Sequence, residues 1–532
     1  INEVVDLSID STGLKGTVKA ASANVSVSDV LANRFDGLTP EQQNEAVNNV
    51  RKTIAQVQKY KSFARHLGGS NDSVVVENDL MKVTFDTRGG IVSQVELKKY
   101  KTEVGAEPAN IRLFNGENDG YGFTLTTSDQ RFNTREFNFK PTVENDSTVL
   151  MTLDLGTGAQ WGLRYTVHHS KYLVKMDIVQ KGMGSILPES TSTIDFNWHN
   201  QMARNEKGRT FEERNSAIHY KFVGEGPDEL SAIGDDSEQL TGRIKWFAFK
   251  NQFFSSVLIA DDYLSSANLN STEIKDSRFL KDMTAHATAP YTIGDGTPAG
   301  FFFYFGPNDY PLLSSIDDEI GGDEGLSLTR LVPLGWGIFR WINQFIVIPV
   351  FSFLGRFISD YGIIILLLTI FIKIIIFPFT YKSFKSQARM RVLAPEIKEI
   401  NDKYPGQENA MKRQQETMAL YSRAGASPFS GCLPLILQMP VLVAMFSFFP
   451  SAIELRGQSF LWVHDLSAPD YILALPFSIP FYGDHVSLFC LLMTIVNIVY
   501  TRINMQNQPG GNSMPGMKWM MYLMPVMFLF IF

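Results

Sequence analysis

The chain has 532 residues, of which 44% are hydrophobic and only 19% charged, and its formal net charge is −7. This composition excludes a disordered chain and argues against a nucleic-acid-binding protein, which would carry a basic surface. Its two cysteines, Cys432 and Cys490, both lie inside apolar runs. The sequence therefore also excludes a disulfide framework and a CxxC metal or redox site, and we expect no cofactor.

The first 72 residues have no recognisable role. Residues 1–35 are rich in Ser, Val and Ala, and we interpret them as a linker. Thr39 and Gln42, which flank a Pro-Glu pair, then predict the start of a short helix, because this spacing is typical of a capping box. The chain begins with Ile rather than Met and opens with no signal segment, so we expect segments to be missing at both of its ends.

Residues 73–315 are predicted to form a large β-sandwich. Short runs in which apolar and polar residues alternate recur there between turn signals, and such alternation is typical of strands with one buried face. The runs lie at 80–86, 91–97, 148–156, 163–169, 172–180, 191–199 and 299–306.

Four side chains in the predicted sandwich could be interpreted as a metal or acid–base site: His168, His169, His199 and Asp195. The adjacent histidines would point to opposite faces of a strand, and the others have no recognised ligand spacing. We therefore interpret them as surface residues of strands, and we expect no catalytic residue and no enzyme activity.

A change in composition follows Gly322, beyond which long apolar runs dominate. Residues 330–359 contain Trp336, Trp341 and Arg340 in an apolar background. This pattern fits either a spanning helix or an amphipathic helix in the membrane interface. We expect the interfacial helix, with Ile338, Ile342 and Phe345 on its apolar stripe and Arg340 off it.

Four later apolar runs, 360–380, 431–453, 486–503 and 517–532, approach the ~20 residues that cross a bilayer, although the last stops short. Lys and Arg in short loops mark the cytoplasmic side. Residues 381–430 contain nine of them, whereas 454–485 contains only Arg456. We therefore place 381–430 and 504–516 in the cytoplasm, and 454–485 and the sandwich outside.

The cytoplasmic segment 381–430 is predicted to be a helical hairpin with a net charge of +4. Leu393, Ile397 and Ile400 recur at helical spacing before a Pro-Gly turn, and Met411 and Met418 recur after it. The alternative is an ordinary basic loop. Four basic residues are predicted to dock partners: Lys398, Lys403, Lys412 and Arg413. Of these, Lys412 and Arg413 are predicted to face solvent.

Lys373 is the only charged residue in the apolar run 362–379. A lysine facing lipid costs several kcal/mol, so it faces protein, water or a partner. Snorkelling to the cytoplasmic surface is the alternative, but helical side chains tilt toward the N-terminus, here away from that surface. Other polar residues could complete a hydrated groove around it: Thr369, Thr380, Gln438, Thr494, Asn497 and Thr501. Individually, each would more often be a helix–helix hydrogen bond.

Several stretches carry a family resemblance. TIFIKIIIFPFTYKSFKSQARMRVLAPEI (369–397), ASPFSGCLPLILQMPVLVAMF (426–446) and FLWVHDLSAPDYIL (460–473) are similar to the core of the YidC membrane-protein insertase family. KWFAFKNQFFSSVLIA (245–260) and FYFGPNDY (303–310) resemble the periplasmic domain of its Gram-negative members. The resemblance covers roughly residues 73–532, in the order of the family.

The resemblance implies a multi-domain protein of the inner membrane, with a periplasmic β-supersandwich followed by an α-helical transmembrane core and a cytoplasmic helical hairpin. Its groove would receive nascent membrane proteins, alone or with the Sec translocon, and its partners would include the ribosome and membrane lipids. Two features depart from the family. Lys373 stands where Arg is usual, and the first and final helices, the latter usually bearing a substrate-contacting tyrosine, are absent.

Two other functions remain open from the residues alone. A secondary transporter could bind a small anionic substrate at Lys373, although we find no internal repeat of the kind that such transporters contain. A sugar-processing enzyme on a membrane anchor would need paired carboxylates in a cleft of the sandwich. The absence of a Walker motif is consistent with an insertase that uses no ATP.

Overall fold

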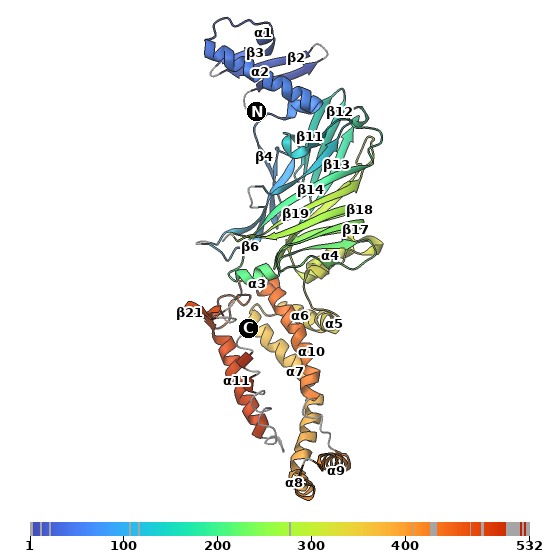
Figure 1. The fold of residues 1–532 in the computed structure, drawn as a ribbon, viewed down its shortest axis with the longest axis vertical. Helices are drawn as coiled ribbons and strands as arrows, with labels where there is room; N and C mark the ends of the chain where they lie inside the picture. The colour runs from blue at the N-terminus through green and yellow to red at the C-terminus, as the bar shows by residue number, and fades with distance from the viewer. Residues whose placement is uncertain are drawn as a thin grey trace. The chain divides into compact units, whose positions relative to one another are not determined.

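The computed structural model describes residues 4–527 apart from 11–12, 21–22, 106–107, 115–117, 276–277, 407, 426–432, 469, 480–482, 507–521 and 524–525. The chain divides into two compact units, Ile1–Leu331 and Val332–Phe532 (Figure 1). The predicted loop 504–516 and the last apolar run 517–532 lie almost entirely outside the described residues.

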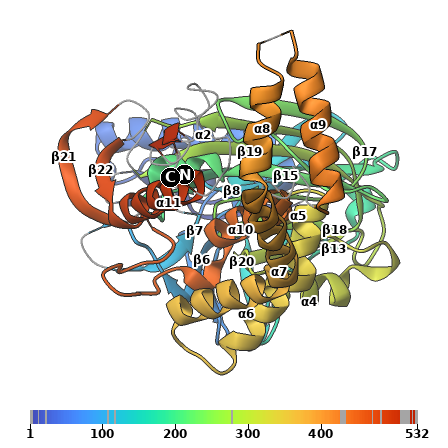
Figure 2. The same ribbon diagram turned by 90° about the horizontal axis from the view of Figure 1, so that it is seen from below.

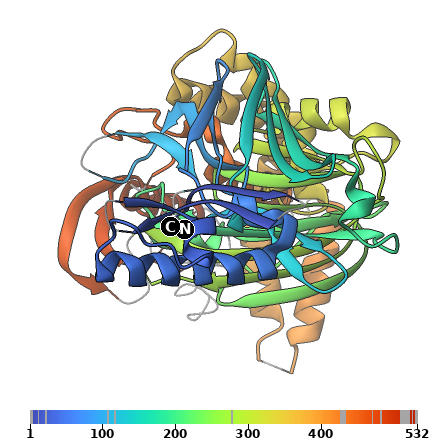
Figure 3. The same ribbon diagram turned by 90° about the horizontal axis from the view of Figure 1, so that it is seen from above.

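The first residues form a small folded module rather than a linker. Strands β1 (Val4–Asp10), β2 (Gly13–Ala20) and β3 (Ala23–Ser26) make an antiparallel sheet, followed by α1 (Val27–Leu31) and α2 (Pro40–Tyr60). Helix α2 lies along this sheet (Figure 3). The linker prediction for 1–35 is wrong, because small apolar residues there close a core with α2: Val18, Ala20, Val25, Val27, Val30, Ala46 and Val50.

The predicted start of α2 is confirmed. The Gln42 backbone N–H donates to Thr39 Oγ1 at 3.3 Å, and the Thr39 N–H donates to Gln42 Oε1 at 3.0 Å. This reciprocal pair satisfies two donors that every helix N-terminus leaves without an internal acceptor.

A β-sandwich follows, as predicted, and its smaller sheet contains β4 (Ser73–Glu77), β5 (Met81–Asp86), β6 (Ile91–Lys101) and β7 (Asn110–Leu113). The larger sheet has the order β10-β11-β12-β13-β20-β18-β19-β14-β8-β9, with β15, β16 and β17 continuing from β18. Its strands are β8 (Gly120–Thr126), β9 (Arg131–Asn133), β10 (Lys140–Asn145), β11 (Thr148–Gly156), β12 (Ala159–Val167), β13 (Leu173–Lys181), β14 (Thr193–Ala203), β15 (Ala217–Phe222), β16 (Asp228–Glu229), β17 (Asp236–Lys250), β18 (Phe254–Glu273), β19 (Phe279–Pro290) and β20 (Gly300–Pro307). Two short helices, α3 (Arg209–Arg214) and α4 (Tyr310–Ile320), complete the unit.

Buried tyrosines join the two sheets. Tyr121 donates its hydroxyl to Tyr165 at 2.9 Å, and Tyr165 donates to the Gly90 carbonyl at 2.8 Å. Gly90 lies in the turn between β5 and β6 with φ +63°, a conformation that favours glycine. Burial of one large apolar side chain contributes about 1.5–3 kcal/mol to the free energy of unfolding. The apolar rings of this core therefore contribute more to its stability than its few hydrogen bonds do.

Lys250, at the end of β17, is a buried cation in this unit. It is 3% exposed, and its ammonium donates to the Asn215 carbonyl at 2.7 Å. Burial lowers the pKa of Lys250 to about 8, with the Glu229 carboxylate opposing the shift.

We therefore expect the free energy of unfolding of the wild type to rise, relative to Lys250→Met, as pH rises from 8 to 10.5. The unfolded state binds the extra proton in that window, and the cost of holding the buried charge, roughly 3 kcal/mol, is relieved there. Urea unfolding of both proteins between pH 7 and 10.5 checks this, and a difference that stays constant would contradict it.

The second unit is helical. Its described elements are α5 (Ile338–Ile342), a π-helical turn (Asn343–Val347), α6 (Ile348–Gly355), α7 (Tyr361–Val392), α8 (Ala394–Lys403), α9 (Ala410–Arg423), α10 (Leu433–Phe448), the strands β21 (Tyr471–Ile479) and β22 (Gly483–Ser487), and α11 (Leu488–Gln506). By length and composition, Ile338–Gly355 and Tyr361–Val392 could each cross a membrane, and Ile436–Ser451 and Leu488–Ile503 are shorter apolar helices. The strands β21 and β22 form a ladder that begins in the predicted loop 454–485 and extends two residues beyond it, to Ser487.

The structure separates the three residues of the apolar stripe predicted for 330–359. Ile338 and Phe345 are exposed at 58% and 64%, whereas Ile342 is only 6% exposed. Arg340 lies off the exposed side, as predicted, and is 8% exposed. Asn343 is fully buried and donates through Nδ2 to the carbonyls of Leu334 (3.0 Å) and Ala444 (2.7 Å), so this side of the helix packs against α10.

The start of α7 depends on a glycine. A Cβ on Gly362 would lie 2.0 Å from Cδ2 of Phe460, so the ring of Phe460 occupies the space of the absent side chain. We expect Gly362→Ala to destabilise the helical unit by about 1–3 kcal/mol, as overpacking does. Thermal unfolding of the detergent-solubilised chain checks this. The matched control is Gly355→Ala, whose Cβ would meet nothing closer than Tyr361 Oη at 3.9 Å. Equal unfolding midpoints for the two variants would contradict the expectation.

Candidate functional site

Lys373 and Gln438 meet between α7 and α10. The ammonium of Lys373 donates to Gln438 Oε1 at 3.1 Å, although 65 residues separate them in sequence. Lys373 lies twelve residues after the start of α7, about 18 Å along the helix axis. Among the described residues, Gln438 is its only hydrogen-bond partner.

This pair keeps a net positive charge. A carboxamide is a neutral acceptor, and an ammonium has three N–H donors, so Gln438 occupies one donor and leaves two for water or a ligand. Lys373 is an exposed residue on α7 and Gln438 is half-buried on α10. The arrangement can therefore attract an anionic or polar group.

Two prolines add acceptors beside the pair. Pro378 lies inside α7 and Pro440 inside α10. Because proline has no N–H, the carbonyls of Ile374 and Ile436, four residues earlier, lose their helical hydrogen bonds. Free carbonyls at membrane depth are tolerated where water or protein reaches them. These two acceptors were not among the predicted groove residues, although Pro378 and Pro440 are the sequence signal for them.

The predicted threonines on α7 bond to their own helix. Thr369 donates through Oγ1 to the Ile365 carbonyl at 2.8 Å, and Thr380 donates to the Ile376 carbonyl at 3.1 Å. Such back-bonding is the usual use of threonine in apolar helices. Both hydroxyls keep lone pairs that can accept from water.

The predicted face of α11 shows a similar pattern. Thr494 is buried and donates to the Cys490 carbonyl at 2.9 Å, while Asn497 and Thr501 are half-buried. No hydrogen bond described for these three residues reaches Lys373 or Gln438. Within the described residues, the hydrogen bond between Lys373 and Gln438 is therefore the one described between two of the predicted groove residues.

Helices α8 and α9 lie side by side as an antiparallel hairpin (Figure 2). Lys398, Lys403 and Lys412 are exposed. Arg413 is half-buried and donates from Nη1 to the Tyr404 carbonyl at 3.2 Å, so it supports the end of α8. The prediction that Arg413 faces solvent is therefore wrong.

The inner stripe predicted for α9 is also wrong in part. Met411 and Met418 are exposed at 75% and 45%, and Leu420 is the buried residue. Arg413 and Thr417 are half-buried, and Thr417 donates to the Arg413 carbonyl of the same helix at 2.7 Å.

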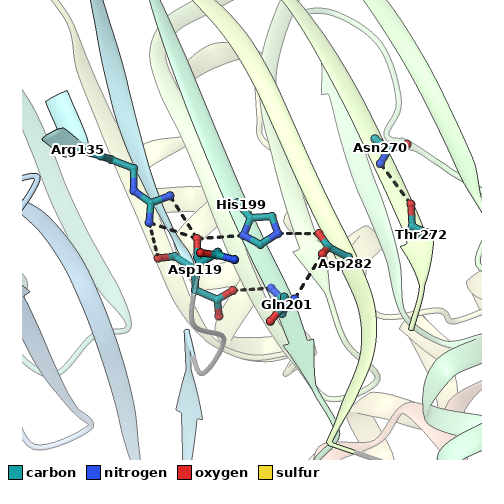
Figure 4. A network of polar contacts seen from close by, with 8 residues as sticks. Asp119, Arg135, His199, Gln201, Asn270, Thr272 and Asp282 are labelled. Carbon is teal, nitrogen blue, oxygen red and sulfur yellow. Dashed lines mark hydrogen bonds and ion pairs between the residues drawn. The ribbon is translucent and has the colours of Figure 1, made fainter. Parts of the chain in front are cut away.

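The histidines and Asp195 of the sandwich make structural contacts. His199 lies between the Asn118 carbonyl, 3.0 Å from Nδ1, and Asp282 Oδ1, 2.7 Å from Nε2 (Figure 4). Asp195 pairs with Arg131 and accepts from Thr288 Oγ1 at 3.0 Å. Burial lowers the pKa of His168, whose ring lies 6.0 Å from that of Phe302. His169 is exposed in the turn after β12, which ends at Val167, so the prediction that His168 and His169 lie in a strand is wrong. These contacts tie neighbouring strands and a loop together.

Comparisons with known proteins also divide the chain into two parts, but they place the boundary near residue 350, inside α6, rather than at Leu331. The family model described as YidC periplasmic domain matches residues 73–349, and the one described as 60Kd inner membrane protein matches residues 353–532. A membrane protein insertase YidC from Parabacteroides distasonis is 46% identical over 482 residues, which cover 89% of this chain and 76% of that protein. One from Porphyromonas gingivalis is 39% identical over 524 residues, 97% of this chain and 83% of that protein.

Solved structures give weaker likenesses. A crystal structure of an active YidC insertase with its first transmembrane domain resolved is 18% identical, covers 91% of this chain and 92% of that chain, and gives a TM-score of 0.30. A galactose mutarotase-like protein from Lactobacillus casei is 8% identical, covers 44% of this chain and all (100%) of that chain, and also gives a TM-score of 0.30. The assignment therefore rests on sequence, which offers no support for a transporter. The two family models and the relatives of 39–46% identity show that the chain belongs to the YidC membrane protein insertase family.

Proposed function

We propose that the chain inserts nascent membrane proteins into the inner membrane, and that the pair Lys373–Gln438 is the polar contact for their translocated segments. The observation that carries the proposal is the 3.1 Å hydrogen bond from a mid-helix ammonium to a neutral amide. The pair keeps its positive charge and two free donors at a depth where any charge is costly. No catalytic step is needed, so the proposed activity is that of an insertase without enzyme chemistry of its own.

The physical benefit is a shorter path through hydrocarbon. A hairpin that enters the bilayer must carry its polar end across a layer about 30 Å thick, where a charged side chain costs several kcal/mol. Water held by Lys373, Gln438 and the carbonyls freed by Pro378 and Pro440 would hydrate part of that path. Thr369, Thr380, Thr494, Asn497 and Thr501 are proposed to line the remainder.

The orientation proposed for the chain follows from its charges. The basic hairpin α8–α9 lies in the cytoplasm, where Lys398, Lys403 and Lys412 would dock ribosomes, and the sandwich lies in the periplasm. Arg413 supports this docking surface by holding the end of α8. Cooperation with the Sec translocon and contacts with membrane lipids are proposed from family membership, as is the absence of nucleic-acid recognition beyond the ribosome.

Depletion and complementation test this function. A strain depleted of its own insertase, supplied with this chain carrying any missing terminal segments, should regain insertion of a short substrate with a protease-accessible periplasmic tail. Ile374→Ala is the matched control for variants of Lys373 and should restore insertion as the wild type does. Ile374 is next to Lys373 but is exposed at 65% on the apolar surface of α7. Failure of the wild-type chain to restore insertion, although it is present in the membrane, would contradict the proposal.

A further inference from the structure

The connection between α10 and β21 is folded by its own hydrogen bonds. The buried carboxylate of Asp465 accepts through Oδ1 from the backbone N–H groups of Gly457 (2.9 Å) and Ser467 (2.8 Å). Phe460 and Val463 exchange two backbone hydrogen bonds, of 2.9 and 3.0 Å. The residues between them, Leu461 and Trp462, are therefore the tip of a tight turn, which we call the 461–462 tip.

The 461–462 tip presents an apolar surface. Leu461 is 72% exposed and has φ +54°, a left-handed conformation that a leucine rarely adopts. Trp462 is 40% exposed, its ring lies 4.7 Å from that of Phe489, and its indole N–H donates to Asp470 Oδ2 at 3.3 Å. Strain and exposure of a large apolar side chain both cost free energy in water, so the tip is better suited to another environment.

Contacts on either side fix the level of the tip relative to the helices. The ring of Phe460 packs on Gly362, the second residue of α7. The Asp470 carboxylate that accepts from Trp462 also accepts from the Phe489 N–H, at 2.9 Å, at the start of α11. The tip therefore lies level with the N-terminal ends of α7 and α11, where both apolar helices begin.

We infer that the 461–462 tip is a lipid anchor that dips into the outer leaflet beside the starts of α7 and α11; the inference rests on the membrane orientation proposed above. A tryptophan with its N–H satisfied and its ring half exposed is typical of the membrane interface. The residues that flank the tip, Phe460 and Val463, are uncharged. An exposed leucine beside such a tryptophan fits the glycerol and upper acyl region of a phospholipid better than it fits water.

Depth-dependent quenching of a fluorescent label tests the inference. Single-cysteine variants would be made in the full chain with Cys432 and Cys490 replaced by Ser, labelled with a small environment-sensitive dye, and reconstituted into vesicles of phosphatidylethanolamine and phosphatidylglycerol. The quenchers are iodide in water and a nitroxide near the top of the lipid acyl chain. Leu461→Cys is compared with Phe377→Cys on α7, 63% exposed, and with Val143→Cys in the sandwich, 59% exposed.

We expect the lipid nitroxide to quench most of the emission of the label on Leu461→Cys, and iodide to quench little of it. The label on Phe377→Cys should behave in the same way. The label on Val143→Cys should be quenched by iodide and not by the nitroxide. Quenching by iodide alone would place the tip in water and overturn the inference. Protection from both quenchers would mean that protein covers the tip, which would also overturn it. If the label on Phe377→Cys is not quenched by lipid, the proposed membrane placement fails instead.

Discussion

Lys373→Glu should reduce insertion of substrates with acidic translocated tails by well over tenfold, and Lys373→Ala by roughly tenfold, because each 1.36 kcal/mol added to a barrier slows a step tenfold. Two charges 4 Å apart interact by about 4 kcal/mol at the effective dielectric constant of a protein surface. Lys373→Arg keeps the charge and should retain most of the activity. The measurement is protease protection of a pulse-labelled substrate in the depletion strain.

Changes at Gln438 separate charge from geometry. Gln438→Glu keeps an oxygen acceptor 3.1 Å from Lys373 but cancels the net charge of the pair, so it should impair insertion about as much as Lys373→Ala. The exchange Lys373→Gln with Gln438→Lys moves the cation from α7 to α10 without removing it. Insertion should recover in this double variant compared with Lys373→Gln alone. Normal insertion by Lys373→Glu, expressed at wild-type levels, would refute the role of the charge.

The second large effect concerns the hairpin. Reversal of both Lys398 and Lys412 to Glu should weaken ribosome binding strongly, because it removes the +4 net charge predicted for residues 381–430. Both side chains are exposed, so folding should not change. Added salt should weaken wild-type binding in the same direction, since the Debye length is only about 8 Å at 0.15 M ionic strength. Co-sedimentation with ribosome–nascent-chain complexes over a salt series measures both effects.

Arg413 must stay intact in that experiment. Its guanidinium holds the Tyr404 carbonyl at 3.2 Å, so Arg413→Glu would disturb the hairpin as well as its charge. The matched control is Glu399→Lys, which adds positive charge to exposed surface of α8 and should strengthen binding. If ribosome binding changes neither with salt concentration, nor in the double reversal, nor in the control variant, the hairpin is an ordinary basic loop and not a docking surface.

Much of the sandwich could be predicted from sequence because its strands alternate buried and exposed residues. Strand β11, for example, was predicted at 148–156 and lies at Thr148–Gly156. Strand β18 was not predicted, because Phe254–Ala260 is buried on both faces and then Asp261–Asp262 breaks the apolar run. A run buried on both faces shows no alternation. The sheet β1–β3 was missed because its core uses small residues such as Ala20 and Val25.

The candidate site could likewise be predicted only in part from the sequence. That Lys373 needed a partner followed from the cost of a charge in an apolar helix, and Gln438 was the one amide available on its neighbour. The packing of Asn343 against α10 could not be foreseen, because its hydrogen-bond acceptor is the backbone carbonyl of Ala444, 101 residues away. Helical periodicity reports an apolar face but carries no information about carbonyls on another helix.

The central claim is that translocated polar segments pass Lys373 and Gln438. The most direct measurement is photo-crosslinking of a stalled nascent chain to a probe placed at Gln438, with a matched probe at Ile436, which lies two residues away on α10 and is exposed at 62%. We predict that the polar translocated segment crosslinks to the probe at Gln438, and that its hydrophobic segment is favoured at Ile436. Crosslinks of the polar segment that are equally strong at both positions, or absent from Gln438, would contradict the claim.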